Sequence, residues 1–111
     1  MRKLSLVALA REHLDKATKA PNGRSSTTVY GGHEHVMRQT LIALTAGTVL
    51  AEHESPGEAT VYVLAGRVRL VAGDDSWEAR EGDLLIAPPD RQSLEALADA
   101  VVVLSVGARE P

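Results

Sequence analysis

The side chains most able to take part in chemistry are four polar residues in the first half of the chain: His33, His35, His53 and Ser55. His33 and His35 form the chain's only His-x-His pair, and on a β-strand this spacing would place both rings on one face. A neutral imidazole is the commonest side-chain metal ligand, so metal binding is the first chemistry to consider. An exposed strand start after Gly31-Gly32 also explains the pair, and we prefer that interpretation.

Nucleophilic catalysis is not indicated by the same residues. Ser55 and His53 would share one face of a strand, but no third group that orients the imidazole and no oxyanion loop can be identified. The chain has no cysteine, which excludes disulfides, thiolate metal ligands and cysteine nucleophiles. We therefore predict no catalytic residues.

The first element expected to support a site is a short amphipathic helix over residues 4–19. Apolar residues recur there at intervals of three and four, which is a helical period; they are Leu6, Leu9 or Ala10, Leu14 and Ala17. Ser5 is a suitable N-cap, and Pro21-Asn22-Gly23 is expected to end the helix. Such a helix needs a surface to cover, either the outside of a barrel or a partner subunit.

The rest of the chain is expected to form short strands. Residues 25–28 should form a linker, and from Val29 onward runs rich in Val, Leu and Ile alternate with turn signals. The clearest runs are Val36–Thr45, Val49–His53, Ala59–Ala65, Val68–Val71, Leu84–Ala87 and Val101–Val106. Short strands between closely spaced turns are typical of an all-β sandwich or barrel. We expect a helix and linker over residues 1–24 and a barrel over residues 25–111.

Two polar stretches within this pattern have simple explanations. Arg38, Gln39 and Thr40 are expected to form an exposed polar strand face, although they are able to place a polar group inside the barrel. Asp74-Asp75 is expected to lie in a hairpin turn, with Trp77 at the beginning of a short strand.

The composition limits the possible partners. The net charge is -3, and the aromatic residues are Trp77, Tyr30 and Tyr62, so the basic, aromatic surface that binds single-stranded nucleic acid is not expected. No stretch approaches the ~20 apolar residues of a membrane span. The N-terminal run resembles a signal peptide, but Arg11-Glu12-His13 interrupts it and no cleavage site follows. We expect no nucleic-acid or membrane partner and a cytoplasmic location.

The segment from Gly47 to Leu94 resembles the cupin superfamily. Gly47, His53 and Gly66 match the spacing of the family's first motif, and the second motif is matched from Gly82 to Pro88. The glycines and the proline serve turns that a tight barrel requires. The resemblance implies an all-β fold, a double-stranded β-helix or cupin jelly-roll barrel, with the short N-terminal α-helix added to it.

The ligand positions of the first motif depart from the family's pattern. Ser55 replaces the second histidine, and the glutamate position is Ala59 with the shorter family spacing or Thr60 with the longer. Glu58 is close by in sequence, but it should point away from the side of Ala59, because strand side chains alternate between faces.

The histidine of the second motif is also replaced. It corresponds to Gln92 if one residue is missing from the turn after Pro89, and to Ser93 otherwise; we prefer Gln92. The resemblance thus implies a pocket whose polar end is formed by His53, Ser55 and Gln92.

No resident metal is predicted, because divalent transition metals generally need three or more protein ligands. Of the family's usual four ligands, His53 alone clearly remains. If a divalent metal is bound, at low occupancy, we expect His53 and Gln92 to hold it, with His33 and His35 as alternative donors.

These observations predict a protein that binds or senses a small molecule and has lost most of a metal site. Two alternatives stay open: a metal-dependent cupin dioxygenase, isomerase or decarboxylase with non-standard ligands, and an accessory or regulatory module without a ligand.

The resemblance to single-domain cupins also implies a homodimer. The N-terminal helix and the apolar outer residues of Val61–Leu64 are expected to contribute to its interface.

Overall fold

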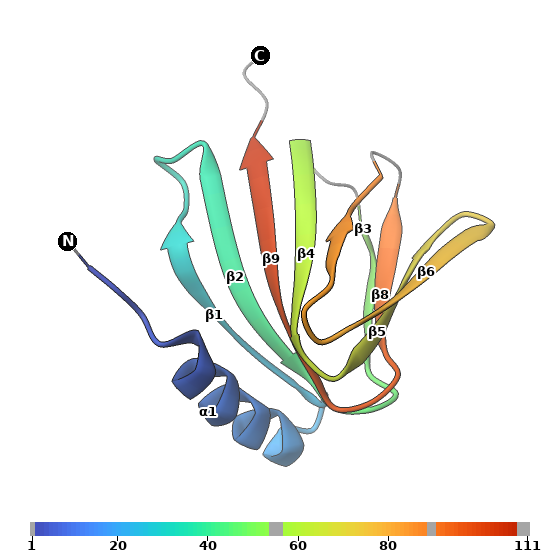
Figure 1. Ribbon diagram of the computed structural model, residues 1–111, viewed down its shortest axis with the longest axis horizontal. Coiled ribbons are helices and arrows are strands. Elements are labelled where there is room, and N and C mark those ends of the chain that lie inside the picture. The colour runs from blue at the N-terminus through green and yellow to red at the C-terminus, as the bar shows by residue number, and fades with distance from the viewer. Residues whose placement is uncertain (1, 54–56, 89–90, 109–111) are drawn as a thin grey trace.

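The chain forms two layers of β-structure with a helix on one side (Figure 1). The computed structural model describes residues 2–53, 57–88 and 91–108. Within these ranges the elements are α1 (Leu6–Lys19), β1 (Arg24–Gly31), β2 (Met37–Leu44), β3 (Val49–His53), β4 (Gly57–Ala65), β5 (Arg67–Ala72), β6 (Asp75–Arg80), β7 (Leu84–Ile86), β8 (Gln92–Ala96) and β9 (Ala100–Ala108). No helix in the described ranges is long and apolar enough to cross a membrane.

The strands form two antiparallel sheets. One has the order β1-β2-β9-β4-β7, and the other has the order β3-β8-β5-β6. Strands that are far apart in sequence are therefore neighbours: β9 lies between β2 and β4, and β8 lies between β3 and β5. This interleaving is typical of a jelly roll, so the predicted all-β fold with a short N-terminal helix is confirmed.

The main hydrophobic core lies between the two sheets. Successive side chains of a strand point to opposite faces, and in β5 Val68 and Leu70 are buried on either side of the half-buried Arg69. The other strands add aliphatic residues to the same cluster: Ile42, Leu44, Val61, Val63, Leu94, Ala96 and Val102. We call the sheet faces that meet in this core the inner faces.

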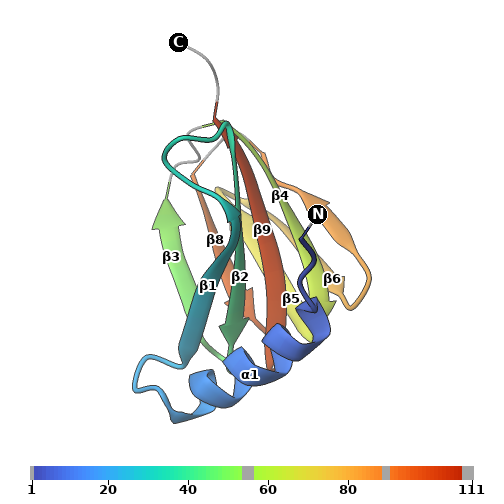
Figure 2. The ribbon, with the colours of Figure 1, turned by 90° about the vertical axis from the view of Figure 1, so that its left-hand side faces the viewer.

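Helix α1 covers part of the outer face of the five-stranded sheet (Figure 2). A second apolar cluster lies beneath it, formed by Ala17, Leu41, Ala43 and Val101 with partly buried neighbours. The Ser5 side chain caps the helix by accepting a hydrogen bond from the Ala8 backbone N–H at 3.2 Å. The predicted amphipathic helix and its cap are confirmed.

The structure contradicts the expectation that residues 25–28 form a linker. They lie within β1, which pairs with β2 along its length. Exposed and half-buried side chains alternate along this strand, and threonine fits a half-buried pleated surface well. The stretch is polar because β1 is an edge strand with one solvent-exposed face.

One motif glycine has a clear steric role. Gly66, in the turn between β4 and β5, has a φ of 80°, which residues with a Cβ atom rarely adopt. A Cβ at this position would overlap the Asp99 carbonyl oxygen. The turn therefore needs glycine for both its dihedral angle and its close packing.

The strand ends that carry the predicted site lie at one end of the barrel, together with the β1–β2 hairpin (Figure 1). Met37 at the start of β2 pairs with Gly107 near the end of β9, and Gly57 at the start of β4 pairs with Ala108. β3 ends and β8 begins on this side, where His53 pairs with Gln92. We call this side the hairpin end.

Candidate ligand-binding site at the hairpin end

Two of the three predicted pocket residues are neighbours in the four-stranded sheet. The Cα atoms of His53 in β3 and Gln92 in β8 are partners in the antiparallel register, after a register shift that follows Leu50. The side chain of His53 and the whole of Ser55 lie outside the described residues. The backbone thus brings two predicted residues together from segments almost forty positions apart in sequence.

Gln92 is a buried polar residue on the inner face. Its side chain is 5% exposed, and it alternates along β8 with Leu94 and Ala96, which both belong to the main core. Its Nε2 donates a hydrogen bond to the Pro88 carbonyl oxygen at 3.2 Å. Ser93 occupies the intervening, half-buried position, so Gln92 is the residue that faces the barrel interior.

Of the two candidate positions for the family's glutamate, Ala59 and Thr60, the inward-facing one is Ala59. Ala59 in β4 is 7% exposed and alternates with Val61 and Val63, which face the main core. Glu58 is exposed on the other face and Thr60 is half-buried there. The prediction that Glu58 points away from the side of Ala59 is confirmed, because no register shift occurs at this point of β4.

His33 and His35 do not lie on a strand, so the same-face geometry considered for them is wrong. Both are exposed in the turn between β1 and β2, where Gly31 and Gly32 have φ values of 83° and 138° and reverse the chain. The His35 ring packs edge-on against Tyr30, with ring centroids 5.4 Å apart. Both histidines border a cavity of about 210 Å³ at the hairpin end.

Arg38 lies on the inner side of β2, a placement that the sequence allows but that we did not prefer. It pairs with Val106, which in turn pairs with Ala59, and it shares the inner side of β2 with Ile42, four residues later. Arg38 and Val106 also line the cavity beside the two histidines. Counting back in steps of two from the aliphatic end of β2 would have identified Arg38 as inward-facing.

The expected exposed polar face over residues 38–40 is correct for Arg38 alone, because Gln39 and Thr40 are half-buried. Gln39 points to the outer face, where its Nε2 donates a hydrogen bond to Ser105 Oγ at 3.0 Å. Alternation assigns its two neighbours to the inner side. A polar run in a strand is divided between two environments because the period of the strand is two residues.

The described donors do not fit a firmly held divalent metal. No group of three or more His, Cys, Asp or Glu side chains suitable for a metal occurs among the residues that the structure describes. At the two described family positions, Ala59 offers no donor and Gln92 offers an amide, which already donates to Pro88. What these groups can do is bind a small polar or anionic molecule through an amide and a cation, beside an aliphatic wall.

Comparisons with known proteins agree with this architecture. A family model described as a cupin domain matches residues 40–93. No curated protein sequence matches the chain.

Solved structures share the fold at low sequence identity. A conserved protein of unknown function from Streptococcus pyogenes has a TM-score of 0.74 and 22% identity, covering 83% of this chain and 80% of that chain. A cupin superfamily protein from Desulfitobacterium hafniense has a TM-score of 0.71 and 14% identity, covering 78% of each chain.

The fold also occurs within a larger enzyme. A salicylate 1,2-dioxygenase from Pseudaminobacter salicylatoxidans has a TM-score of 0.74 and 17% identity, covering 90% of this chain but 33% of that chain. At such identities these likenesses concern the fold alone. Together with the cupin-domain model matched over residues 40–93 and the interleaved two-sheet topology, they show that this chain has the cupin fold.

Proposed function

We propose that this cupin binds or senses a small molecule at the hairpin end of the barrel, and that this role needs no resident metal. The observation that carries the proposal is the burial of Ala59 and Gln92 on the inner face, at two positions where the family has ligands. A methyl group and a hydrogen-bonded amide suit the recognition of a ligand better than the coordination of a cation.

The proposed site has an apolar wall and a polar rim. Val61 and Leu94 belong to the aliphatic core that lines the barrel, while Gln92 supplies an amide and Arg38 supplies a positive charge. His53 and Ser55 complete the polar group in this proposal, because His53 is paired with Gln92 in the backbone register. A small acid or another polar metabolite fits this combination, and we propose that it is met in the cytoplasm.

The test is a thermal-shift screen of small carboxylic acids and polyketide-like metabolites, followed by calorimetric titration of each hit. A ligand that binds only the folded state raises its stability by RT ln(1 + [L]/Kd). We expect at least one hit to stabilise the protein equally with and without a chelator. Gln92→Ala should weaken that hit, while Gln39→Ala, which removes an amide from the outer face, should not.

Two other results would each support a different role. Stoichiometric metal in untagged protein, lost in His53→Ala, would establish the metal-dependent alternative. A screen in which no compound stabilises the protein would favour an accessory module that acts through protein contacts alone.

We also propose that the protein is a homodimer, as its resemblance to single-domain cupins implies. Of the residues expected at the interface, Tyr62 is exposed on the outer face, whereas Val61 and Val63 are buried inside. Leu64 packs against the cluster beneath α1. The support for an interface here is that Leu84 and Ile86 of β7 extend the exposed apolar surface beside Tyr62.

A further inference from the structure

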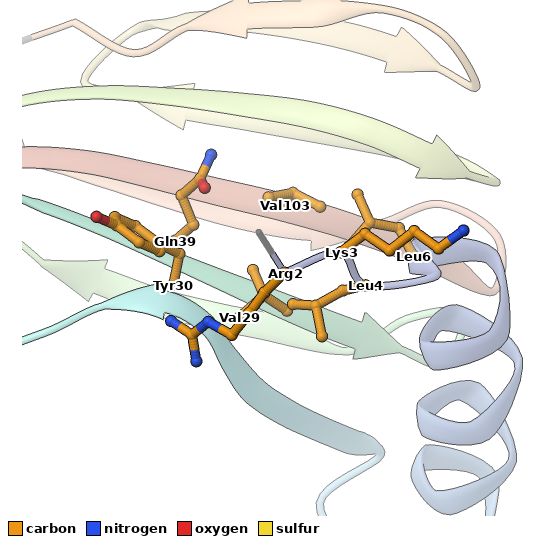
Figure 3. Close-up of a pocket in the computed structure, with 8 residues that line it drawn as sticks. All are labelled: Arg2, Lys3, Leu4, Leu6, Val29, Tyr30, Gln39 and Val103. Carbon is orange, nitrogen blue, oxygen red and sulfur yellow. The ribbon is translucent and has the colours of Figure 1, made fainter.

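A cavity of about 360 Å³ lies outside the barrel, between the N-terminal segment and the outer face of the five-stranded sheet (Figure 3). Val103 of β9 lines it, and this residue points away from the core that contains its neighbour Val102. The thickness of a β-sheet therefore separates this cavity from the barrel interior. It is a different place from the site at the hairpin end.

The body of the cavity is apolar. Val29 and Val103 line it from the sheet, and Leu4 and Leu6 line it from the N-terminal segment and the start of α1. Its volume is at the low end of the roughly 300–1,000 Å³ that is typical of small-ligand sites. A short aliphatic chain or a single ring would suit such a space.

Polar groups converge at one end of this space. Tyr30 and Gln39 are partners in the β1–β2 register, and Figure 3 shows the phenol and the amide side by side. The hydrogen bond to Ser105 Oγ, at 3.0 Å, fixes the Gln39 amide. The Tyr30 ring packs edge-on against His35, with ring centroids 5.4 Å apart.

The charge around the cavity is positive. Arg2 and Lys3 line it together with no acidic side chain, and neither forms an ion pair within the described part of the chain. Figure 3 shows Arg2 extending over β1 on the side of Tyr30, whereas Lys3 extends toward α1. The guanidinium is the cation nearer to the polar end, and guanidinium groups bind carboxylates by paired hydrogen bonds.

We propose that this cavity is a second binding site, which takes a small amphipathic carboxylate. The apolar body of the ligand lies against Val29 and Val103, and its carboxylate accepts hydrogen bonds from Arg2 and the Tyr30 hydroxyl. The Gln39 amide completes the polar end. This site is independent of the one proposed inside the barrel, so either can exist without the other.

The test is a titration with sodium octanoate, followed by amide NMR of protein without an N-terminal tag. We expect saturable shifts centred on Val29, Tyr30, Gln39 and Val103. Octan-1-ol and octylammonium have the same chain without the negative charge, and each should bind at least about tenfold more weakly, since charge-assisted hydrogen bonds to a carboxylate are among the stronger ones. Equal binding of octan-1-ol, or no saturable shift, would overturn the proposal.

Two substitutions test whether Arg2 and Gln39 bind the carboxylate at the polar end of this cavity. Arg2→Ala and Gln39→Leu should each weaken octanoate binding several-fold, while Arg67→Ala, which removes a cation from the other sheet, should leave it unchanged. Arg2 is exposed, so its truncation leaves the fold intact. Octanoate shifts centred on Gln92, or unchanged affinity in Arg2→Ala, would show that the ligand binds elsewhere and would contradict the assignment.

Discussion

At the residue scale, the alternation of side chains along β8 determines which polar group the barrel interior offers to a ligand. The motif spacing left Gln92 and Ser93 open, because a deletion in the preceding turn shifts every later position by one. In the structure Gln92 is the more buried of the two, next to Pro88 and one position of alternation from the core residue Leu94. An amide at Gln92 and a methyl group at Ala59 give the inner face groups that suit the ligand pocket proposed above.

If the pocket is a family metal site without its donors, restoring the donors should restore the metal. The triple variant Ser55→His/Ala59→Glu/Gln92→His, with the native His53, would carry a full set of four ligands. We expect it to retain stoichiometric Ni²⁺ or Zn²⁺ after dialysis, measured by elemental analysis, because four protein donors bind transition metals firmly. The unmodified protein should retain little under the same conditions.

A matched control moves two of these donors to the neighbouring positions. It carries Ser55→His with Thr60→Glu and Ser93→His, and both moved side chains lie on the faces that alternate with the inner one. This control should retain no more metal than the unmodified protein. Equal metal in both triple variants would mean that the family geometry is not preserved here.

At the scale of elements, the attachment of α1 to the sheet depends on a buried polar contact. His13 is 6% exposed, and its Nδ1 is 2.7 Å from Ser25 Oγ in β1. The contact joins the helix to β1, whose residues 25–28 the sequence pattern predicts to be a linker. A buried polar group that loses its partner destabilises a fold by about 1–3 kcal/mol.

Ser25→Ala should therefore lower the free energy of unfolding by about 1–3 kcal/mol, because it leaves a buried His13 nitrogen without its partner. Ser26→Ala is a matched control on the exposed side of the same strand, and surface substitutions usually stay within about 0.5 kcal/mol. Urea denaturation of both variants measures the difference. Equal stability of the two would show that this hydrogen bond does not hold the helix in place.

The elements that the sequence predicted share an aliphatic composition. The sequence predicts β3 with its observed bounds, and β2, β4, β5, β7 and β9 to within a few residues at their ends. These strands are predictable because a local run of Val, Leu and Ile indicates a buried strand by itself. β1 and β8 were missed as full strands. β1 is rich in Ser and Thr, and β8 contains Gln92 and Glu95. Their strand structure depends on pairing with distant segments, which a local pattern does not contain.

At the scale of the whole molecule, the outer face of the five-stranded sheet is only partly covered. Beyond α1, Tyr62, Leu84 and Ile86 form an exposed apolar patch across β4 and β7, with exposed fractions of 38%, 55% and 74%. Tyr62 pairs with Leu84, and the uncharged Thr60 pairs with Ile86. A second copy of the chain offers the same uncharged surface, so a two-fold symmetric contact would match apolar groups to apolar groups. The cavity proposed for a carboxylate lies toward the opposite edge of this sheet.

This geometry predicts a dimer that a single charge disrupts. Light scattering coupled to gel filtration should give twice the chain mass for the unmodified protein and the monomer mass for Ile86→Glu, since a buried unpaired carboxylate is strongly unfavourable. Val36→Glu is the matched control: Val36 is similarly exposed, at 64%, but lies in the turn between β1 and β2. It should remain dimeric. A monomeric unmodified protein would contradict the dimer itself, whereas a dimeric Ile86→Glu would move the interface away from β7, leaving α1 as the surface to test next.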